Sequence, residues 1–156
     1  MNLKVKIVFA SFVVSLLAAC STSTSVSRVL DSEPRNMVEV VRVIDGDTLD
    51  VLISDITHRV RLYGVDTPER GEPCYHDATE RLKQLAGNVV RIEAGPRAED
   101  NYGRLLFYLS TLSGESIDAM LITEGLATAW TRDGQYRDLL VNLERDTRVQ
   151  GVGCLW

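Results

Sequence analysis

The chain has 156 residues, of which 45% are hydrophobic and 25% are charged, and this length and composition are typical of one globular domain. They exclude a disordered chain, a collagen-like repeat and a protein with many membrane spans. Acidic residues outnumber basic ones by 22 to 17, which argues against a generic DNA-coating protein, because such a protein would be basic throughout.

The first twenty residues are typical of a targeting segment. Lys4 and Lys6 form a short positive region, and an almost unbroken apolar run over 7–19 follows. This run is shorter than the roughly twenty residues that a membrane-spanning helix needs, but it has the length of the apolar part of a signal peptide. The small residues before Cys20 resemble the bacterial lipoprotein box. We therefore predict a lipoprotein signal peptide over 1–19 and lipidation of Cys20, with an ordinary cleaved signal peptide as the alternative.

Residues 20–36 are rich in Ser and Thr, contain Pro34 and show no apolar periodicity. This composition predicts a flexible tether between the lipid and the folded domain. Ser21 directly after the cysteine resembles sorting to the outer membrane in bacteria with two membranes. We therefore expect an exported, lipid-anchored protein of the cell envelope that faces the periplasm or the outside. Residues 1–19 carry two lysines and no acidic residue. Without them, the chain has 15 basic and 22 acidic residues, which gives a net charge of −7.

The folded domain is expected over 37–156, and its first half reads as a meander of three strands. The strands are predicted at 38–44, 48–53 and 58–65 from their β-branched and alternating residues. The pair Asp45-Gly46 between the first two strands is a hairpin-turn signal. A loop over 66–76 follows.

The second half combines two strands with three helices. A helix over 77–86 is expected to begin with Asp77 as N-cap and Glu80 in a capping box. A strand at 89–93, an exposed polar loop at 95–103 and a strand at 104–111 come next. The last two helices are indicated by apolar spacing, one ending near Gly125 and one with a stripe expected in the core: Tyr136, Leu139, Leu140 and Leu143. This order predicts an α+β fold with a five-stranded OB-fold β-barrel and three helices.

Two cysteines remain after Cys20. Cys74 and Cys154 in an exported chain suggest one disulfide. A zinc site that adds His76 and a pair of free buried thiols are the alternatives, and the zinc site lacks a CxxC element.

Two carboxylates are expected to meet at one end of the meander. Asp47 begins the second strand and Asp66 ends the third, so both side chains lie at the same end of neighbouring strands. Paired carboxylates suit a hard divalent cation with oxygen ligands, and the Thr67 carbonyl is placed to add a third oxygen. No Cys or His belongs to this cluster, which points away from zinc and copper.

The chemistry around this cluster suits cleavage of a phosphodiester. Glu69 is placed to accept a proton from a metal-polarised water. Arg61, on the strand that leads into the cluster, and Arg104, after the DNYGR loop at 100–104, are candidates for binding the phosphate and its developing charge.

These motifs together resemble the staphylococcal nuclease (thermonuclease) family. They are IDGDT at 44–48, RLYGVDTPE at 61–69, DNYGR at 100–104, EGLA at 124–127 and the closing LW, so the resemblance covers about 38–156. It implies a five-stranded OB barrel with three helices and Ca²⁺-dependent hydrolysis of DNA and RNA that leaves 3′-phosphates.

The resemblance also implies roles for individual residues. The implied calcium ligands are Asp47, Asp66 and the Thr67 carbonyl, with Asp45 as a carboxylate beside them. The implied catalytic residues are Arg61, Glu69 and Arg104, and Tyr102 matches an aromatic residue that contacts the bound nucleotide. Trp130 either stacks on the nucleotide or belongs to the core.

Two departures predict a weaker and more salt-sensitive nuclease than better-known members. Asn101 stands where the family has a basic residue next to the nucleotide, and the net charge without the signal segment is −7. Phosphate contacts supply most non-specific nucleic-acid affinity. The chain is expected to be a monomer. The alternative function is a non-catalytic OB-fold module on the cell envelope that binds nucleic acid or protein.

Overall fold

The structure is a computed structural model that describes residues 36–156. The predicted signal peptide, Cys20 and the predicted tether up to residue 35 lie outside the described residues. Within 36–156, no helix is both long and apolar enough to cross a membrane.

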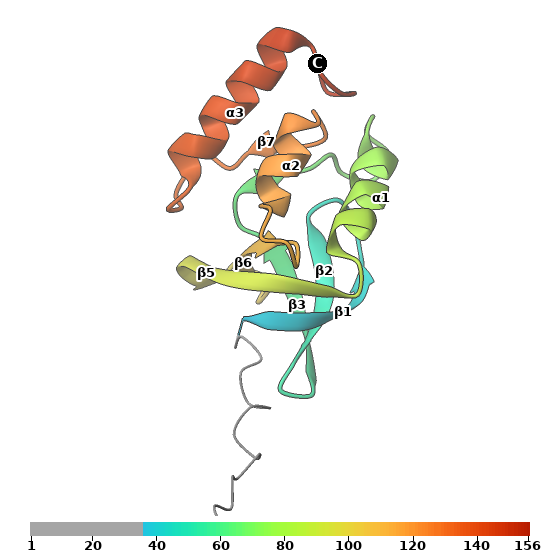
Figure 1. Cartoon of the computed structure of the whole chain (residues 1–156), viewed down its shortest axis with the longest axis vertical. Coiled ribbons are helices and arrows are strands. Elements are labelled where there is room, and N and C mark those ends of the chain that lie inside the picture. The colour runs from blue at the N-terminus through green and yellow to red at the C-terminus, as the bar shows by residue number, and fades with distance from the viewer. Residues whose placement is uncertain (1–35) are drawn as a thin grey trace, which may run out of the picture. The chain divides into compact units, whose positions relative to one another are not determined.

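Five strands close a barrel in the order β1-β2-β3-β6-β5, which confirms the predicted five-stranded barrel with three helices. Figure 1 shows β1, β2 and β3 as a meander, in which both strand pairs are antiparallel. The barrel closes through a parallel pairing of β3 with β6 and antiparallel pairings of β5 with β6 and β1. The strands are β1 (Met37–Val43), β2 (Thr48–Ile53), β3 (Ile56–Leu62), β5 (Val89–Glu99) and β6 (Leu105–Ser110).

A small second sheet joins the end of the meander to the helical part. It pairs β4 (Val65–Asp66) with β7 (Thr128–Ala129) in antiparallel fashion. The backbone N–H of Trp130 also donates to the Gly64 carbonyl at 2.8 Å. The segment after β3 is therefore held by residues 128–130 where the predicted site residues begin.

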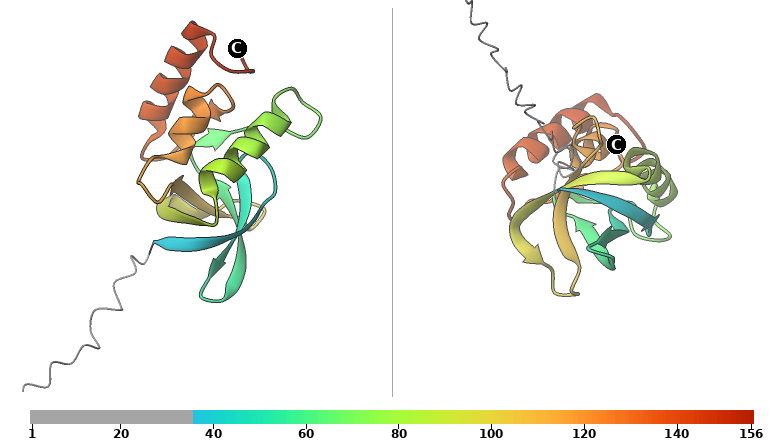
Figure 2. Two further views of the ribbon diagram at one scale, coloured as in Figure 1. Left: turned by 45° about the vertical axis from the view of Figure 1, so that its right-hand side comes forward. Right: turned by 60° about the horizontal axis from the view of Figure 1, so that its bottom comes forward.

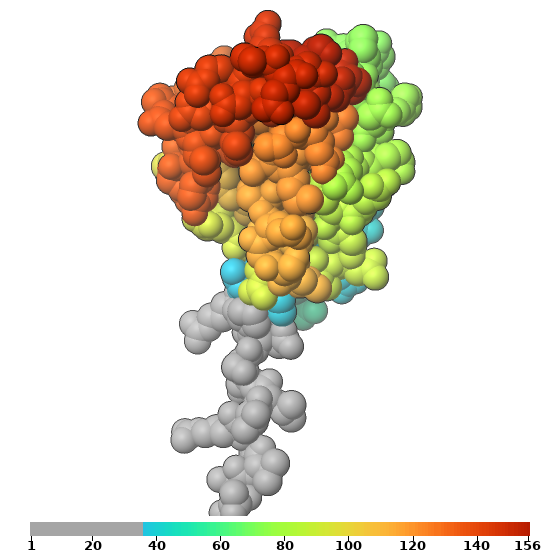
Figure 3. Space-filling model, turned by 45° about the horizontal axis from the view of Figure 1, so that its top comes forward, coloured from blue at the N-terminus to red at the C-terminus, as the bar shows by residue number. Residues whose placement is uncertain are grey.

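Three helices pack beside the barrel: α1 (Tyr75–Ala86), α2 (Ile117–Thr123) and α3 (Arg137–Gln150). The middle helix, α2, contacts both α1 and α3 as well as β6, and the three lie side by side on the face in Figure 3. The two views of Figure 2 show that the helices gather at one end of the barrel.

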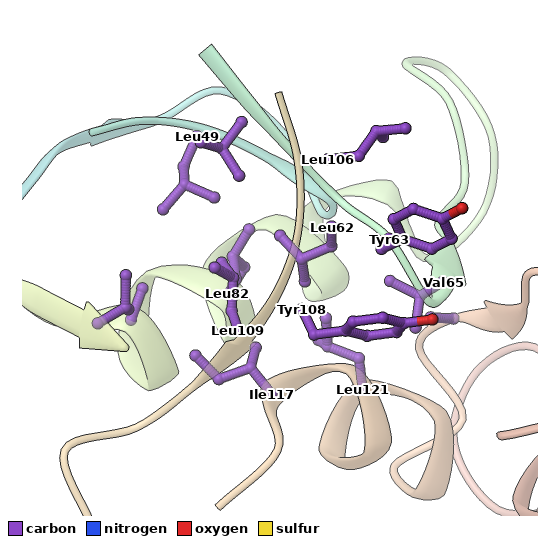
Figure 4. Close-up of a cluster of buried hydrophobic side chains, with 14 of the residues drawn as sticks. Leu49, Leu62, Tyr63, Val65, Leu82, Leu106, Tyr108, Leu109, Ile117 and Leu121 are labelled. Carbon is purple, nitrogen blue, oxygen red and sulfur yellow. The ribbon is translucent and has the colours of Figure 1, made fainter. Parts of the chain in front are cut away.

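The core is formed by aliphatic side chains from both the barrel and the helices. Leu49 and Leu62 of the strands belong to the same buried cluster as Leu82 of α1 and Leu121 of α2, and all four are fully buried (Figure 4). Burying such a side chain contributes about 1.5–3 kcal/mol. The helices are thereby fixed on the strands that carry the site.

A buried carboxylate connects α2 to the strand that leads into the site. The Asp118 carboxylate accepts hydrogen bonds from the backbone N–H groups of Gly64 (2.9 Å) and Leu109 (3.1 Å). Burial raises the pKa of Asp118 to about 6, against the opposite effect of these two hydrogen bonds. Gly64 allows this close approach, because a Cβ there would lie 2.9 Å from Asp118 Oδ1 and 2.3 Å from Leu140 Cδ1.

The predicted start of the first helix is wrong. α1 begins at Tyr75, and Cys74 is its N-cap with a left-handed backbone (φ 69°) and no side-chain cap hydrogen bond. Asp77 and Glu80 lie inside the helix, so no capping box forms there. The Cys74–Cys154 disulfide holds the residue before the helix, and this tertiary link sets the boundary in place of a local cap.

The predicted polar loop at 95–103 is also only partly right, because β5 continues to Glu99. The register with β6 shifts between Ala94 and Glu99, so a bulge absorbs the extra residues. Gly95 suggested a loop, but its position requires glycine for packing: a Cβ there would lie 2.4 Å from the Tyr63 ring.

The apolar stripe predicted for the last helix is only half buried. Leu140 is buried and Leu143 packs partly against the core, whereas Leu139 is 56% exposed and Tyr136 is 38% exposed. Tyr136 precedes α3, and its hydroxyl donates to Glu93 at 2.8 Å. The helix has apolar neighbours on one narrow side, so fewer positions are covered than its spacing predicts.

Candidate active site

Arg61 stands at the centre of the candidate site, near the end of β3. Its Nε lies 3.0 Å from Asp47 Oδ1, and its Nη2 donates to Asp66 Oδ1 at 2.7 Å. Its Nη1 donates to the carbonyls of Leu62 and Val65. The side chain is only 10% exposed. One guanidinium group therefore brings together the two carboxylates that were predicted to converge from neighbouring strands.

Asp47 is held in place by hydrogen bonds from two segments. Its Oδ1 accepts from the Thr48 hydroxyl at 3.0 Å, and its Oδ2 accepts from both the backbone N–H (3.0 Å) and the hydroxyl (2.9 Å) of Thr67. Gly46 permits this contact, since a Cβ there would lie 2.7 Å from Thr67 Oγ1. The tight turn before β2 is thus packed directly against the segment after β4.

Asp45 lies at the same turn, as predicted, and its Oδ1 accepts the Asp47 N–H at 3.2 Å. Burial raises the pKa of Asp45, and the negative charge of Asp47 raises it further. The turn therefore concentrates negative charge beside the Asp47–Asp66 pair.

Arg104 is positioned by the loop that precedes β6. Asp100 Oδ1 accepts the backbone N–H groups of Tyr102 (2.8 Å) and Arg104 (3.0 Å), and its Oδ2 pairs with Arg104 Nε at 2.7 Å. Burial opposes ionisation of Asp100, but these bonds from Arg104 and Tyr102 lower its pKa overall. Gly103 has a φ of +76°, a left-handed conformation that favours glycine.

Arg61 and Arg104 line one cavity of about 360 Å³, within the usual range for ligand pockets of about 300–1,000 Å³. Arg104 Nη1 also reaches Thr48 Oγ1 at 3.4 Å, so it lies close to the turn that carries Asp47. Both predicted aromatic residues, Tyr102 and Trp130, line the same cavity. The cavity therefore combines cationic and aromatic walls.

The two aromatic residues differ in their surroundings. Tyr102 is 87% exposed, with the guanidinium carbon of Arg104 at 5.6 Å from its ring centroid. Trp130 is half-buried against the core, and its Nε1 donates to Asp133 at 2.8 Å. Trp130 is therefore both a core neighbour and a wall of the cavity.

Glu69 is the predicted site residue that the structure leaves apart. It is exposed on the loop between β4 and α1, and its backbone N–H donates to Glu72 Oε2 at 2.7 Å. Among residues 36–156, no hydrogen bond or ion pair links its carboxylate to Arg61 or Arg104. Its carboxylate faces solvent on the same loop that Thr67 begins.

The cysteines fasten this loop to the end of the chain. Cys74 and Cys154 form a disulfide across a separation of 80 residues, with their Cα atoms 5.8 Å apart. The zinc alternative with His76 is thereby ruled out, because both sulfur atoms are bonded to each other. The backbone N–H of Leu155 also donates to the Gly125 carbonyl at 3.2 Å.

Three polar residues of the cavity were missed by the sequence reasoning: Arg97, Arg132 and Asp133. Arg97 lies in the part of β5 that was expected to be a loop, and Arg132 and Asp133 follow Trp130 in a segment without clear periodicity. Asp133 pairs with Arg97 at 2.6 Å. Closeness in sequence to Trp130 was an available signal for Arg132 and Asp133, but nothing in the sequence pointed to Arg97.

The donor chemistry fits a hydrated hard cation. The second carboxyl oxygen of Asp66 and the carbonyl of Thr67 accept no hydrogen bond from the described residues, and the Asp66 side chain is 58% exposed. No group of three or more His, Cys, Asp or Glu side chains in residues 36–156 could enclose a metal. Water would complete the coordination, as is common for calcium and magnesium.

The comparisons agree with this geometry. Residues 59–156 match the family described as "Staphylococcal nuclease homologue". The chain belongs to the staphylococcal nuclease family. The family match begins within β3 and includes every candidate active-site residue except Asp45 and Asp47.

Several curated relatives extend the match toward the N-terminus. A protein named micrococcal nuclease from Shigella flexneri is 35% identical over 127 residues, covering 76% of this chain and 72% of the relative. A thermonuclease from Staphylococcus intermedius is 36% identical over 126 residues, covering 75% and 74%. An uncharacterized endonuclease from Escherichia coli is 34% identical over 119 residues, again covering 75% and 74%.

Proposed function

We propose that this chain is a Ca²⁺-dependent nuclease that hydrolyses phosphodiester bonds in DNA, RNA or both and leaves 3′-phosphates. The observation that carries the proposal is that Arg61 and Arg104 line one cavity beside the paired carboxylates of Asp47 and Asp66. The names of the relatives, which include nuclease, thermonuclease and endonuclease, support the same activity.

The two arginines contribute differently to phosphate binding. Three N–H donors of Arg61 form hydrogen bonds to Asp66 and to two backbone carbonyls, and its Nε is engaged in the ion pair with Asp47 at 3.0 Å. This leaves one donor for substrate, at a fixed position. Arg104 is held through Nε by Asp100 and is 29% exposed, so most of its N–H groups remain available. Donors fixed before the reaction stabilise charge that develops on the phosphoryl oxygens.

Calcium, held by Asp47, Asp66 and the Thr67 carbonyl, would supply a polarised water and neutralise phosphate charge. Arg61 keeps the two carboxylates at one place, and the hydrogen bonds from Thr67 keep Asp47 in its orientation. Glu69 is proposed to accept the proton of the attacking water. Its exposed carboxylate, free of hydrogen bonds from the described residues, suits this role.

The decisive experiment is a digestion assay with the purified full chain. Single-stranded DNA and RNA are incubated with Ca²⁺, with Mg²⁺ and with a chelator, and the new ends are analysed for phosphate. Of these three conditions, we expect only Ca²⁺ to support cleavage. The cleavage rate of Glu69→Gln should be about 10²–10⁴-fold lower than that of the wild type. The matched control is Glu72→Gln on the same loop, which should keep most of the activity.

Two results would reject the proposal. One is intact nucleic acid after incubation with Ca²⁺. The other is oligonucleotide binding that survives chelation and yields no product, which would favour the non-catalytic binding module.

We further propose that the protein acts as a lipid-anchored monomer of the cell envelope. Support comes from the apolar run and small residues before Cys20, and stable anchoring needs more than one acyl chain. The test compares the full chain with Cys20→Ser in cell fractions. The variant should leave the membrane fraction, and a variant that stays there would contradict the anchor. Gel filtration of the detergent-solubilised chain tests the monomer.

A further inference from the structure

Arg132 differs from the other arginines that line the cavity. Arg61, Arg97 and Arg104 each have a carboxylate within 3.0 Å. Arg132 is exposed, and none of the carboxylates in residues 36–156 forms an ion pair with it. In a chain with more acidic than basic residues, an arginine in a cavity without such a partner is a positive charge available to a ligand.

The neighbouring carboxylate, Asp133, forms its ion pair with Arg97 and not with Arg132. Asp133 Oδ2 pairs with Arg97 Nε at 2.6 Å, and its Oδ1 accepts from Trp130 Nε1 at 2.8 Å and from Arg97 Nη2 at 3.3 Å. These three bonds also fix the Trp130 ring and the Arg97 side chain as one wall of the cavity.

Arg132 is itself oriented by this wall. Its guanidinium carbon lies 5.1 Å from the centroid of the Trp130 ring. A guanidinium group over an aromatic face is held by cation–π attraction, and its N–H groups stay free to donate. A planar fork of free donors is the arrangement that binds phosphate oxygens in pairs.

Resting on the proposed nuclease function, we propose that Arg132 binds a second phosphate of the substrate, adjacent to the phosphodiester that is cut. Arg61 and Arg104 bind the scissile phosphate, and Arg132 binds its neighbour across the same cavity. Asn101, on the loop that carries Tyr102, has no charge with which to do so. The site therefore selects strands with a phosphate on both sides of a nucleoside over a substrate with a single phosphodiester.

The test compares three minimal substrates with the full chain: a thymidine dinucleotide with one internal phosphodiester, and the same dinucleotide with an added 5′-phosphate or 3′-phosphate. The quantity measured is the ratio of kcat/KM for each phosphorylated substrate to that for the bare one. In the wild type, we expect one ratio to exceed unity by about tenfold, since hydrogen bonds to charged groups contribute about 1.5–3 kcal/mol. The arm that shows the preference identifies the side on which the phosphate lies.

Arg132→Gln should bring this ratio close to unity by raising KM for the phosphorylated substrate. Arg132→Lys should restore part of the preference for that substrate. The matched control is Arg145→Gln, which removes the same charge from an exposed position on α3 outside the cavity. For a longer single strand, the slope of log KM against log salt should fall by about 0.7 in Arg132→Gln alone.

The outcomes separate this proposal from the function on which it rests. A wild type that cleaves none of the substrates overturns both. An active wild type without a phosphate preference overturns the assignment of Arg132 alone. The assignment of Arg132 is also overturned if Arg132→Gln keeps the wild-type ratio of kcat/KM values. It is overturned as well if Arg145→Gln lowers that ratio equally, because the effect would then be one of overall charge.

Discussion

The Cys74–Cys154 disulfide should carry a large part of the stability of this domain. It closes a loop of 80 residues, and the chain-entropy model assigns about 4 kcal/mol to a loop of that size at 25 °C. Domains of this kind are stable by only about 5–15 kcal/mol in total. We therefore expect the double variant Cys74→Ser/Cys154→Ser to lose about 4 kcal/mol of unfolding free energy.

The structure also shows where the loss should appear first. Beyond the disulfide, the backbone after α3 is held by hydrogen bonds from Val152 to the Thr147 carbonyl (3.3 Å) and from Leu155 to the Gly125 carbonyl (3.2 Å). Cys74 directly precedes α1, and four residues separate it from Glu69. Without the disulfide, the end of the chain and the Glu69 loop should open before the barrel does.

Urea unfolding followed by tryptophan fluorescence measures this effect. With an m value of about 1.5 kcal/mol/M, the midpoint should fall by about 2–3 M urea in the double variant. The wild type in excess reductant should unfold like the variant, and reductant should leave the variant unchanged. A variant within about 1 kcal/mol of the oxidised wild type would refute the reasoning, as would a wild type that reductant does not affect.

Three further predictions concern the packing around the site. Burial raises the pKa of Asp118 to about 6 from 3.8, so the folded protein binds the Asp118 proton more tightly than the unfolded chain does. The contribution of this group to stability is therefore greatest below about pH 4 and falls by about 2–3 kcal/mol as the pH rises to 7. Urea unfolding at each pH should show this fall in the wild type and not in Asp118→Asn, and parallel profiles for the two proteins would contradict the prediction. Thr67→Val removes the hydroxyl that donates to Asp47 at 2.9 Å and should cost about 1.5–3 kcal/mol, with unchanged thermal unfolding as the opposing result. Gly64→Ala places a Cβ 2.3 Å from Leu140 Cδ1 and should lower stability by about 1–3 kcal/mol, which a melting temperature equal to that of the wild type would disprove.

Local patterns in the sequence were sufficient to predict the first two strands of the meander, whereas the third, predicted at 58–65, lies at Ile56–Leu62, and Val65 belongs to β4. β-Branched and alternating residues favour extended backbone wherever they occur, and the Asp45-Gly46 turn limits how the first two strands can pair. The convergence of Asp47 and Asp66 followed from this, because adjacent antiparallel strands place the start of one beside the end of the other. The family motifs then suggested a role for each residue.

The tertiary structure decided what depends on contacts between distant segments. The parallel pairing of β3 with β6 closes the barrel, and no local pattern indicates which strands meet across the closing edge. The disulfide placed the start of α1 at Tyr75, and contact with Tyr63 explains Gly95 inside a strand.

The residues that line the cavity show the same difference between what the sequence predicts and what the tertiary structure decides. Trp130 stood out in the sequence as a candidate, but the partners of Arg97 and Arg132 became apparent only in the folded chain. Arg97 comes from β5 and pairs with a carboxylate 36 residues away, whereas Arg132 forms no ion pair with any residue in the described range 36–156. Backbone preference is encoded over a few neighbouring residues, but the availability of a charge depends on every side chain that the fold brings within reach. The sequence alone therefore determined the strands and the motif residues, and the fold decided which cations remain free for a substrate.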